Sequence, residues 1–211
     1  LVLKLMSMIP DSAASVLDVA CGKGASTTCL SKRFDPDKIV GINISEKQLD
    51  TARKNNPGID FRLMSAVELE FEDNSFDAVM CVEAAFHFNT RDAFLAEALR
   101  VLKPGGTLVL SDILMPLEAE ISRKFRHEAN YLEGVEAYAA RLAEIGYVDC
   151  EVIDEIERTW RPMFMATVNF VSERYLRKQI PREGLDLFLQ TNYRIGEDLE
   201  CYLLVSARKE G

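Results

Sequence analysis

The chain is 211 residues long, with 48% hydrophobic and 28% charged residues. A chain of this length can bury a full-sized core in one domain, and its composition predicts a soluble globular protein rather than a disordered one. Its 25 basic and 34 acidic side chains give a formal charge of -9. That charge argues against a nucleic-acid partner, because phosphate binding normally needs a basic face and no run of Lys and Arg occurs.

The cysteines and the apolar segments indicate in which cellular compartment the protein is expected. None of the five cysteines forms a C-x-x-C pair, and their number is odd. Reduced, buried thiols in a cytoplasmic protein explain this pattern better than disulfides or zinc, so no metal site is predicted. No apolar stretch reaches the roughly 18 residues that span a bilayer, and residues 1–9 are too short for a signal peptide. Because the chain begins with Leu1 rather than Met, we expect preceding residues to be missing from this sequence.

Short apolar runs rich in Val, Ile and Leu alternate with helical patterns. The expected strands are 15–20, 38–43, 59–64, 76–82, 107–113, 147–156 and 199–207. The expected helices are 25–34, 46–55, 91–102, 134–145 and a long one within 163–179. This alternation predicts an α/β fold with a mostly parallel sheet covered by helices on both faces. An insertion precedes the final strand, which we expect to lie antiparallel at the edge of the sheet.

Helix-ending signals support these boundaries. Ser45 precedes a helix that Asn56-Pro57-Gly58 ends, and Pro104-Gly105-Gly106 ends another before a buried strand. Gly146 lies where a helix C-cap is expected, just before the sixth strand.

The first expected strand runs directly into a glycine-containing turn, Cys21-Gly22-Lys23-Gly24. Glycine suits this place because the chain must turn sharply, with φ values that other residues avoid, and its backbone must approach a ligand closely. In open α/β sheets, ligands bind beyond the carboxyl ends of the strands. Asp18 lies at that end of the strand, placed to accept hydrogen bonds from an ammonium group. The turn therefore predicts a nucleotide-like ligand.

Two other interpretations fit this turn less well. A generic glycine turn between strand and helix would carry no ligand. A dinucleotide fold needs G-x-G-x-x-G and an acidic residue about 20 residues further on. Here Thr27 stands at the third glycine position, and the second strand ends in Gly41-Ile42-Asn43. These differences disfavour a nicotinamide-dependent oxidoreductase.

Three segments carry a family resemblance: residues 16–24, residues 73–79 before the fourth strand, and residues 99–108 with their Leu-Lys-Pro-Gly-Gly turn. Together they resemble the class I S-adenosylmethionine-dependent methyltransferases, a superfamily with a seven-stranded Rossmann-like sheet whose last strand is antiparallel. The resemblance implies a single methyltransferase domain over residues 1–211, with a lid or insertion at about 159–196.

The same resemblance implies S-adenosyl-L-methionine as the cofactor. It places Asp18, Ala20, Gly22 and Gly24 around the methionine part of that molecule, with Asp18 near its ammonium group. The amides at the start of the following helix would hold the methionine carboxylate.

One departure from the family lies at the end of the second strand. The family usually has Asp or Glu there to hold both ribose hydroxyls, whereas this chain has Asn43. An amide can accept one hydrogen bond and donate another, without the strength of a charge-assisted bond. Residues 41–48 resemble a subgroup with sterol, tocopherol, sarcosine/dimethylglycine, macrolide-sugar and cyclopropane-fatty-acid methyltransferases. That resemblance assigns Asn43 and Gln48 to the ribose and Ile44 to the adenine face, although an ordinary exposed helix residue explains Gln48 equally well.

Recognition of adenine falls to the turn after the third strand. Ser65 stands where the family often has an Asp that contacts the adenine amino group. A hydroxyl can make that contact more weakly, and backbone groups of Ala66 and Val67 are expected to contribute.

A candidate base follows the fourth strand. Methyl transfer is an in-line displacement at a sulfonium, and a hydroxyl, amine or acidic-carbon acceptor also needs a general base. His87 lies where the fold faces the methyl group, and the ordinary pKa of histidine, near 6.5, suits that task. The Glu-x-x-x-His spacing resembles the same subgroup, so we expect His87 to act as base and Glu83 to hold His87 or a substrate amine. The alternatives are a structural histidine packed between Phe86 and Phe88, and a solvent-facing Glu83.

The remaining candidates lie outside this motif. His127 belongs to a polar segment typical of a solvated helix face, and Asp112 ends the fifth strand as an expected pocket residue. Residues 115–133 and 159–196 are the candidates to cover an acceptor, because Met and aromatic side chains suit an adaptable apolar pocket.

The sequence therefore predicts S-adenosylmethionine-dependent methyl transfer to O, N or C of a small organic molecule. It predicts no nucleic-acid partner, no membrane span and a candidate homo-oligomer contact through residues 159–196. The competing hypothesis is a methyltransferase-like binding subunit that has lost catalysis, which Asn43, Ser65 and the short segment before the first strand favour.

Overall fold

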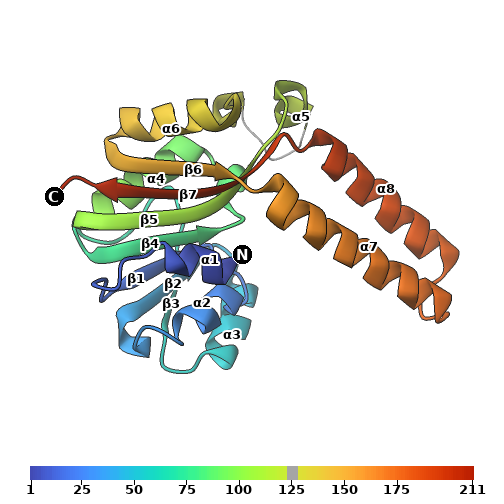
Figure 1. The fold of residues 1–211 in the computed structure, drawn as a ribbon. Helices are drawn as coiled ribbons and strands as arrows, with labels where there is room; N and C mark the ends of the chain where they lie inside the picture. Colours follow the sequence, from blue (N-terminus) through green and yellow to red (C-terminus); the bar gives the residue numbers. More distant parts are fainter. Residues whose placement is uncertain (123–127) are drawn as a thin grey trace.

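The computed structural model describes residues 1–122 and 128–211, without the side chains of 121–128 and 193–198. The prediction for His127 lies outside the described residues. A seven-stranded sheet carries helices on both faces, and a long helical hairpin, residues 161–198, projects from it (Figure 1). We call this hairpin the helical arm.

Seven strands form one sheet in the order β3-β2-β1-β4-β5-β7-β6. Their bounds are β1 (Val16–Val19), β2 (Ile39–Asn43), β3 (Asp60–Leu63), β4 (Phe76–Val82), β5 (Leu102–Leu114), β6 (Tyr147–Asp154) and β7 (Cys201–Lys209). Neighbouring strands are parallel from β3 to β5, and β7 is antiparallel to both β5 and β6. The predicted α/β fold with an antiparallel last strand is confirmed.

The position predicted for the last strand is wrong. β7 lies between β5 and β6, and β6 forms the edge. The residues of β7 from Tyr202 to Val205 are all fully buried, whereas the residues of β6 after Tyr147 are exposed or half-buried. A strand that is apolar on both faces belongs inside a sheet, and a more polar strand suits its edge.

Helices of three to seventeen residues connect these strands. Their bounds are α1 (Val2–Ser7), α2 (Ala25–Leu30), η1 (Pro36–Lys38), α3 (Glu46–Asn55), η2 (Ala85–His87), α4 (Arg91–Val101), α5 (Leu117–Ser122), η3 (Glu128–Asn130), α6 (Gly134–Ile145), η4 (Ile156–Trp160), α7 (Arg161–Leu176) and α8 (Arg182–Asp198). The expected bounds of α3 and α6 are confirmed, and Gly146 caps α6 as predicted. Helices α1, α5 and α8 were not predicted.

The two faces of the sheet build two separate apolar clusters, because successive strand residues point to opposite sides. In β4, Ala78 and Met80 pack under α1, α2 and α3, while Val79 and Cys81 pack under α4 and α6. The short helix α1 is thus a core element, with Leu5 fully buried in the first cluster.

All five cysteines are free. Cys21 and Cys81 are buried as expected, but Cys29, Cys150 and Cys201 are only half-buried. Burial, with Asp18 nearby, raises the pKa of the Cys21 thiol to about 12. Within the described residues, no helix is both long and apolar enough to cross a bilayer.

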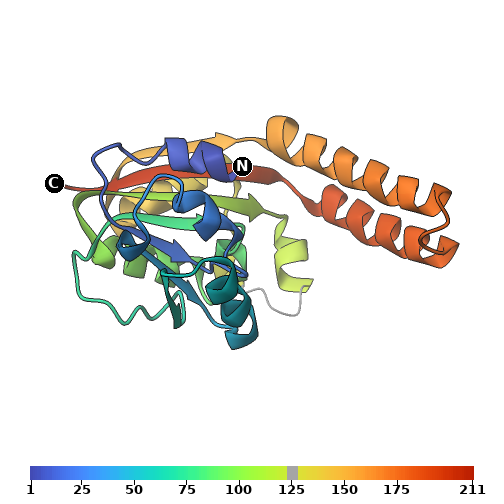
Figure 2. The same cartoon turned by 90° about the horizontal axis from the view of Figure 1, so that it is seen from below.

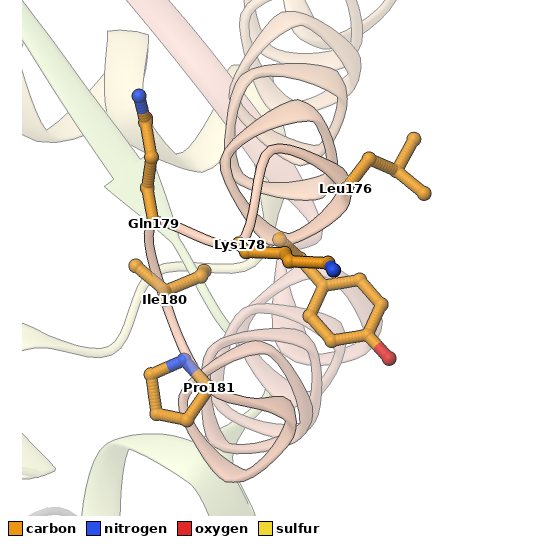
Figure 3. A pocket seen from close by; sticks show the side chains of 6 residues that line it. Leu176, Lys178, Gln179, Ile180 and Pro181 are labelled. Carbon is orange, nitrogen blue, oxygen red and sulfur yellow. The ribbon is translucent and has the colours of Figure 1, made fainter.

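The helical arm leaves the sheet where β6 ends and β7 begins, and both views show it extending away from the strands (Figures 1 and 2). No residue of α7 is buried, and Met165, Phe170 and Leu176 are 53%, 57% and 76% exposed. At the hairpin turn, Tyr175, Leu176 and residues 178–181 line a hollow of about 580 Å³ (Figure 3). The predicted helix within 163–179 is therefore the first half of an antiparallel helix pair.

Candidate ligand-binding site

A cavity of about 660 Å³ lies across the carboxyl ends of β1 to β4, within the range of about 300–1,000 Å³ that small-molecule sites occupy. It brings together nine residues that the sequence singles out: Ala20, Asn43, Ile44, Gln48, Ser65, Ala66, Val67, Glu83 and His87. Ser45, Met64, Ala84, Phe88 and Asn89 complete its lining. The predicted residues Asp18, Gly22 and Gly24 are not among the lining residues.

The turn after β1 needs its two glycines for different reasons. Gly24 has φ +83°, and a Cβ atom there would lie 2.5 Å from Nδ2 of Asn56, so this glycine lets the turn pack against α3. Gly22 has φ +55°, and the nearest atom to a Cβ there would be Oε1 of Gln48 at 4.0 Å. Gly22 therefore keeps bare backbone beside a residue that lines the cavity, as close approach to a ligand requires.

Asp18 lies behind this turn and is fully buried. Its Oδ2 accepts hydrogen bonds from the hydroxyls of Ser26 at 2.8 Å and Thr27 at 2.6 Å. Its Oδ1 has no hydrogen-bond partner among the described residues. Burial raises the pKa of Asp18 to about 6, although these two hydrogen bonds act in the opposite direction. These two hydrogen bonds join the start of α2 to β1 through Asp18. The sequence gave no reason to expect Ser26 and Thr27 as partners of Asp18.

Asn43 and Gln48 form a pair at the end of β2. Nδ2 of Asn43 donates to Oε1 of Gln48 at 2.6 Å, so Gln48, although exposed, is fixed by a partner in the strand. The pair presents the Oδ1 acceptor of Asn43 and the Nε2 donor of Gln48. Ile44, 76% exposed, lines the cavity beside them. This arrangement can bind a group with neighbouring hydroxyls.

The turn after β3 supplies the other wall of this half of the cavity. The hydroxyl oxygen of Ser65 accepts a hydrogen bond from the backbone N–H of Val67 at 3.4 Å. The N–H of Met64 donates to the carbonyl of Asn43 at 3.0 Å, which joins this turn to the end of β2. Ser65 can still donate its own proton or accept a second hydrogen bond.

Glu83 lies at the opposite end of the cavity and has a left-handed backbone, with φ +52°. Its N–H donates to both the carbonyl and the hydroxyl of Ser111 in β5, at 3.2 and 3.0 Å. Its Oε1 accepts a hydrogen bond from the hydroxyl of Tyr202 in β7. Such left-handed non-glycine residues persist where the surrounding structure fixes them, often at functional sites. The sequence carried no signal for Tyr202, because the contact joins residues 119 positions apart.

His87 ends the single turn η2 and faces the same end of the cavity. Its ring lies 4.2 Å from the ring of Phe86, at an interplanar angle of 50°. The side chain of Phe86 is buried while His87 is exposed. The histidine therefore packs against an aromatic ring and remains accessible from the cavity.

Asp112 does not line the cavity, so the expectation that it is a pocket residue is wrong. It is fully buried and accepts hydrogen bonds from Nε of Arg91 at 2.6 Å and from the hydroxyl of Tyr138 at 2.9 Å. Burial alone would lower the pKa of Arg91, but the Asp112 carboxylate raises it above its ordinary value. This buried ion pair joins the start of α4, just after η2, to the end of β5.

A doubly wound sheet with a glycine turn after β1 and a cavity across its strand ends is typical of proteins that bind a nucleotide-like ligand. Comparison with known proteins narrows that class. Residues 17–110 match the methyltransferase domain family. This match includes most of β1, the turn after it and most of β5.

Two curated relatives extend the comparison. The chain is 39% identical over 104 residues to phthiotriol/phenolphthiotriol dimycocerosates methyltransferase 1 of Mycobacterium ulcerans, covering 48% of this chain and 38% of that protein. It is 31% identical over 173 residues to 27-O-demethylrifamycin SV methyltransferase of Amycolatopsis mediterranei, covering 75% of this chain and 63% of that protein. The chain thus spans less than two thirds of the length of these relatives.

A solved structure supports the same fold over the whole chain. Phosphoethanolamine N-methyltransferase 2 of Haemonchus contortus, in complex with S-adenosyl-L-methionine, superimposes with a TM-score of 0.80 and 19% identity, covering 100% of this chain and 52% of that one. The domain match and these relatives together support the class I S-adenosylmethionine-dependent methyltransferase superfamily as the family of this chain.

Proposed function

We propose that this chain is an S-adenosylmethionine-dependent methyltransferase that acts on O, N or C of a small organic molecule. The observation that carries the proposal is one continuous cavity with two chemically different ends. One end has the amide pair and the serine turn, and the other has a carboxylate and an imidazole. A donor molecule and an acceptor can meet inside it without a separate second site.

The residues at the first end fit S-adenosylmethionine. The pair of Asn43 and Gln48 suits the ribose hydroxyls, and Ile44 with the turn of residues 65–67 suits adenine. The small side chain of Ala20 and the bare backbone at Gly22 suit the methionine part. The unpartnered Oδ1 of Asp18 is an acceptor that the ammonium group can use through a bridging water.

At the second end, His87 is proposed as the general base. Bound S-adenosylmethionine supplies a methyl group on a positively charged sulfur. A nucleophile attacks the methyl carbon in line with the carbon–sulfur bond, and the sulfur leaves as a neutral thioether. His87 takes the proton that an attacking hydroxyl or amine loses, and Phe86 holds its ring in place. Glu83 holds a polar group of the acceptor next to it.

The names of the relatives support a small-molecule acceptor rather than a protein or nucleic acid. We retain the predictions of a single methyltransferase domain over residues 1–211, of a lid function for residues 159–196, and of a cytoplasmic location. The exposed apolar residues of the helical arm support a contact between two copies through that segment. A nicotinamide-dependent enzyme has no comparable support.

Isothermal titration calorimetry tests the proposal. We expect S-adenosylmethionine and S-adenosylhomocysteine to bind with dissociation constants of about 1–100 μM, as is typical of enzyme substrates. NAD should not bind. Absence of binding to the folded chain would overturn the proposal, and binding without methylation of any acceptor would favour the inactive binding subunit.

Two glycine variants provide a matched pair for that titration. Gly22 and Gly58 both have positive φ, and a Cβ at either would find no atom closer than 3.9 Å. Gly22→Val and Gly58→Val therefore introduce similar backbone strain, but only Gly22 adjoins the cavity. We expect binding to be lost in Gly22→Val alone.

A further inference from the structure

The cavity contains little charge, and this limits the acceptors it can hold. Among the described lining residues, Glu83 is the only carboxylate, His87 the only imidazole, and there is no Lys or Arg. Phosphate and carboxylate groups are normally bound by Arg, Lys or helix N-termini. A negatively charged acceptor group next to Glu83 would meet like charge without a compensating cation.

The carboxylate of Glu83 is held from outside the cavity. Tyr202, fully buried in β7, donates its hydroxyl to Oε1. Burial and this hydrogen bond raise the pKa of Tyr202 far above its ordinary value, so the hydroxyl remains a donor at all physiological pH values. Oε2 of Glu83 accepts no hydrogen bond from the part of the chain that the structure describes. One oxygen is thus fixed by the fold and the other is available in the cavity.

The same apolar cluster supports both Glu83 and His87. Tyr202 packs in a cluster with Phe86, Ile113 and Met115, and its ring centroid lies 5.9 Å from that of Trp160. Phe86 in turn contacts the ring of His87. A residue of the last strand and a residue of η2 therefore set the relative positions of Glu83 and His87.

We infer that Tyr202 is a positioning residue that fixes Glu83, and that Glu83 in turn anchors a hydroxyl or amine N–H of the acceptor beside the methyl position. The acceptor is consequently neutral or cationic where it meets Glu83, not a phosphate or carboxylate. This inference rests on the proposed function. It adds to that function the chemical class of the acceptor and a role for Tyr202, which lies 119 positions from Glu83. The left-handed backbone of Glu83, held by the hydrogen bond to Ser111, also helps to fix the position of the Glu83 side chain.

The acceptor class is tested with a fixed library of small phenols, alcohols, amines, carboxylates and phosphate esters, with methyl-tritiated S-adenosylmethionine as donor. We expect methylation of library members whose reacting group has a neighbouring hydroxyl or amine. Preferential methylation of phosphate esters or carboxylates overturns the inference. Binding of the cofactor without methylation of any member overturns the inference together with the proposed catalysis, and favours the inactive binding subunit. Failure of cofactor binding overturns the proposed function instead.

The role of Tyr202 is tested with a double-mutant cycle on the best acceptor from that library. Tyr202→Phe keeps the ring against Trp160 and removes only the hydroxyl. We expect it to raise KM for the acceptor about tenfold, as loss of one hydrogen bond to a charged group implies. Glu83→Gln should raise KM about 10- to 100-fold, with the dissociation constant of S-adenosylmethionine unchanged within about twofold in both variants.

The double variant separates positioning from general stability. Because Tyr202 acts through Glu83, Tyr202→Phe should add no further loss to Glu83→Gln. Tyr147→Phe is the matched control, since Tyr147 is also buried and donates its hydroxyl to the carbonyl of Leu95, away from the cavity. It should lower the melting temperature to a similar extent and leave KM unchanged. Additive effects of Tyr202→Phe and Glu83→Gln, or a KM change in Tyr147→Phe equal to that in Tyr202→Phe, overturn the inference.

Discussion

The two ends of the cavity differ in how far apart in the sequence their interacting residues lie. At the first end, Asn43 is held by Gln48 five positions away, and Ser65 by Val67 two positions away. At the second end, Glu83 is held by residues 28 and 119 positions away. The first end is a local structure of short uncharged side chains, whereas the second end depends on the assembled sheet.

This difference indicates how each end responds to change. Substitutions at the local end should weaken one ligand contact and leave the fold intact. Substitutions of Glu83 and His87 at the second end should affect turnover. Substitutions of the buried ion pair behind it, Asp112 with Arg91, should affect the stability of the sheet, because buried charged contacts are costly to break. The following predictions test that contrast, beginning with the largest expected effect.

Removal of the proposed base should have the largest effect. His87→Ala is expected to lower kcat by about 100- to 10,000-fold for a hydroxyl or amine acceptor, the usual contribution of a general base. Single-turnover kinetics with labelled cofactor measure it. Calorimetry on the same variant should show cofactor affinity unchanged within about twofold. Unchanged turnover would refute the base role and would favour a structural histidine.

Breaking the buried ion pair should destabilise the fold. Asp112→Ala leaves Arg91 buried without its carboxylate, which should lower the free energy of unfolding by about 3–5 kcal/mol. Denaturant titration followed by circular dichroism measures the loss. Glu173→Ala is the control, because Glu173 pairs with Arg177 at the exposed surface of α7 and should cost only about 0.3–0.5 kcal/mol. Equal effects would contradict the contrast between buried and exposed pairs.

Asp18 should make stability depend on pH. Its pKa in the folded protein is raised from 3.8 to about 6, so the folded state holds the proton more tightly than the unfolded state. The stabilising contribution is present below about pH 4 and is lost as the pH rises through about 6, amounting to about 3 kcal/mol.

Asp18→Asn removes that titration. Between pH 4 and 7 the wild-type protein should therefore lose about 2 kcal/mol of unfolding free energy relative to the variant, as denaturant titrations across this range would show. Saturating S-adenosylmethionine should reduce the difference, because a nearby positive charge favours the carboxylate. Parallel pH profiles for the two proteins would show that Asp18 is not perturbed.

The smallest effect is expected at the local end. Asn43→Ala removes one uncharged hydrogen bond to the ribose and should weaken S-adenosylmethionine binding by about fivefold, or about 1 kcal/mol. Asn43→Asp should instead strengthen binding by a few-fold, because a carboxylate makes charge-assisted hydrogen bonds. Calorimetry decides both, and equal affinities for all three proteins would remove Asn43 from the ribose site.

The contrast also explains what the sequence could predict. Asn43, Ser65 and His87 could be placed in one cavity because each follows a parallel strand, and the carboxyl ends of such strands meet at one edge. The bounds of α3 were predictable from local capping and turn residues.

Long-range partners could not be predicted in this way. Nothing local to Asp112 indicates that Arg91 is its partner, and nothing local to Tyr202 indicates Glu83. The place of β7 inside the sheet is also a tertiary property, since an apolar strand can pair on one side or both. Helix α8 was missed because Pro181 and Gly184 interrupt the pattern at its start, although proline is tolerated there.

The order of strands has a consequence for protease digestion. The helical arm has few buried apolar contacts, so its turn near Lys178 should open and be cleaved before the sheet. The fragment after the cut contains β7, which pairs with β5 on one side and β6 on the other. Limited trypsin digestion should therefore yield two fragments that co-elute in gel filtration and separate only in denaturant.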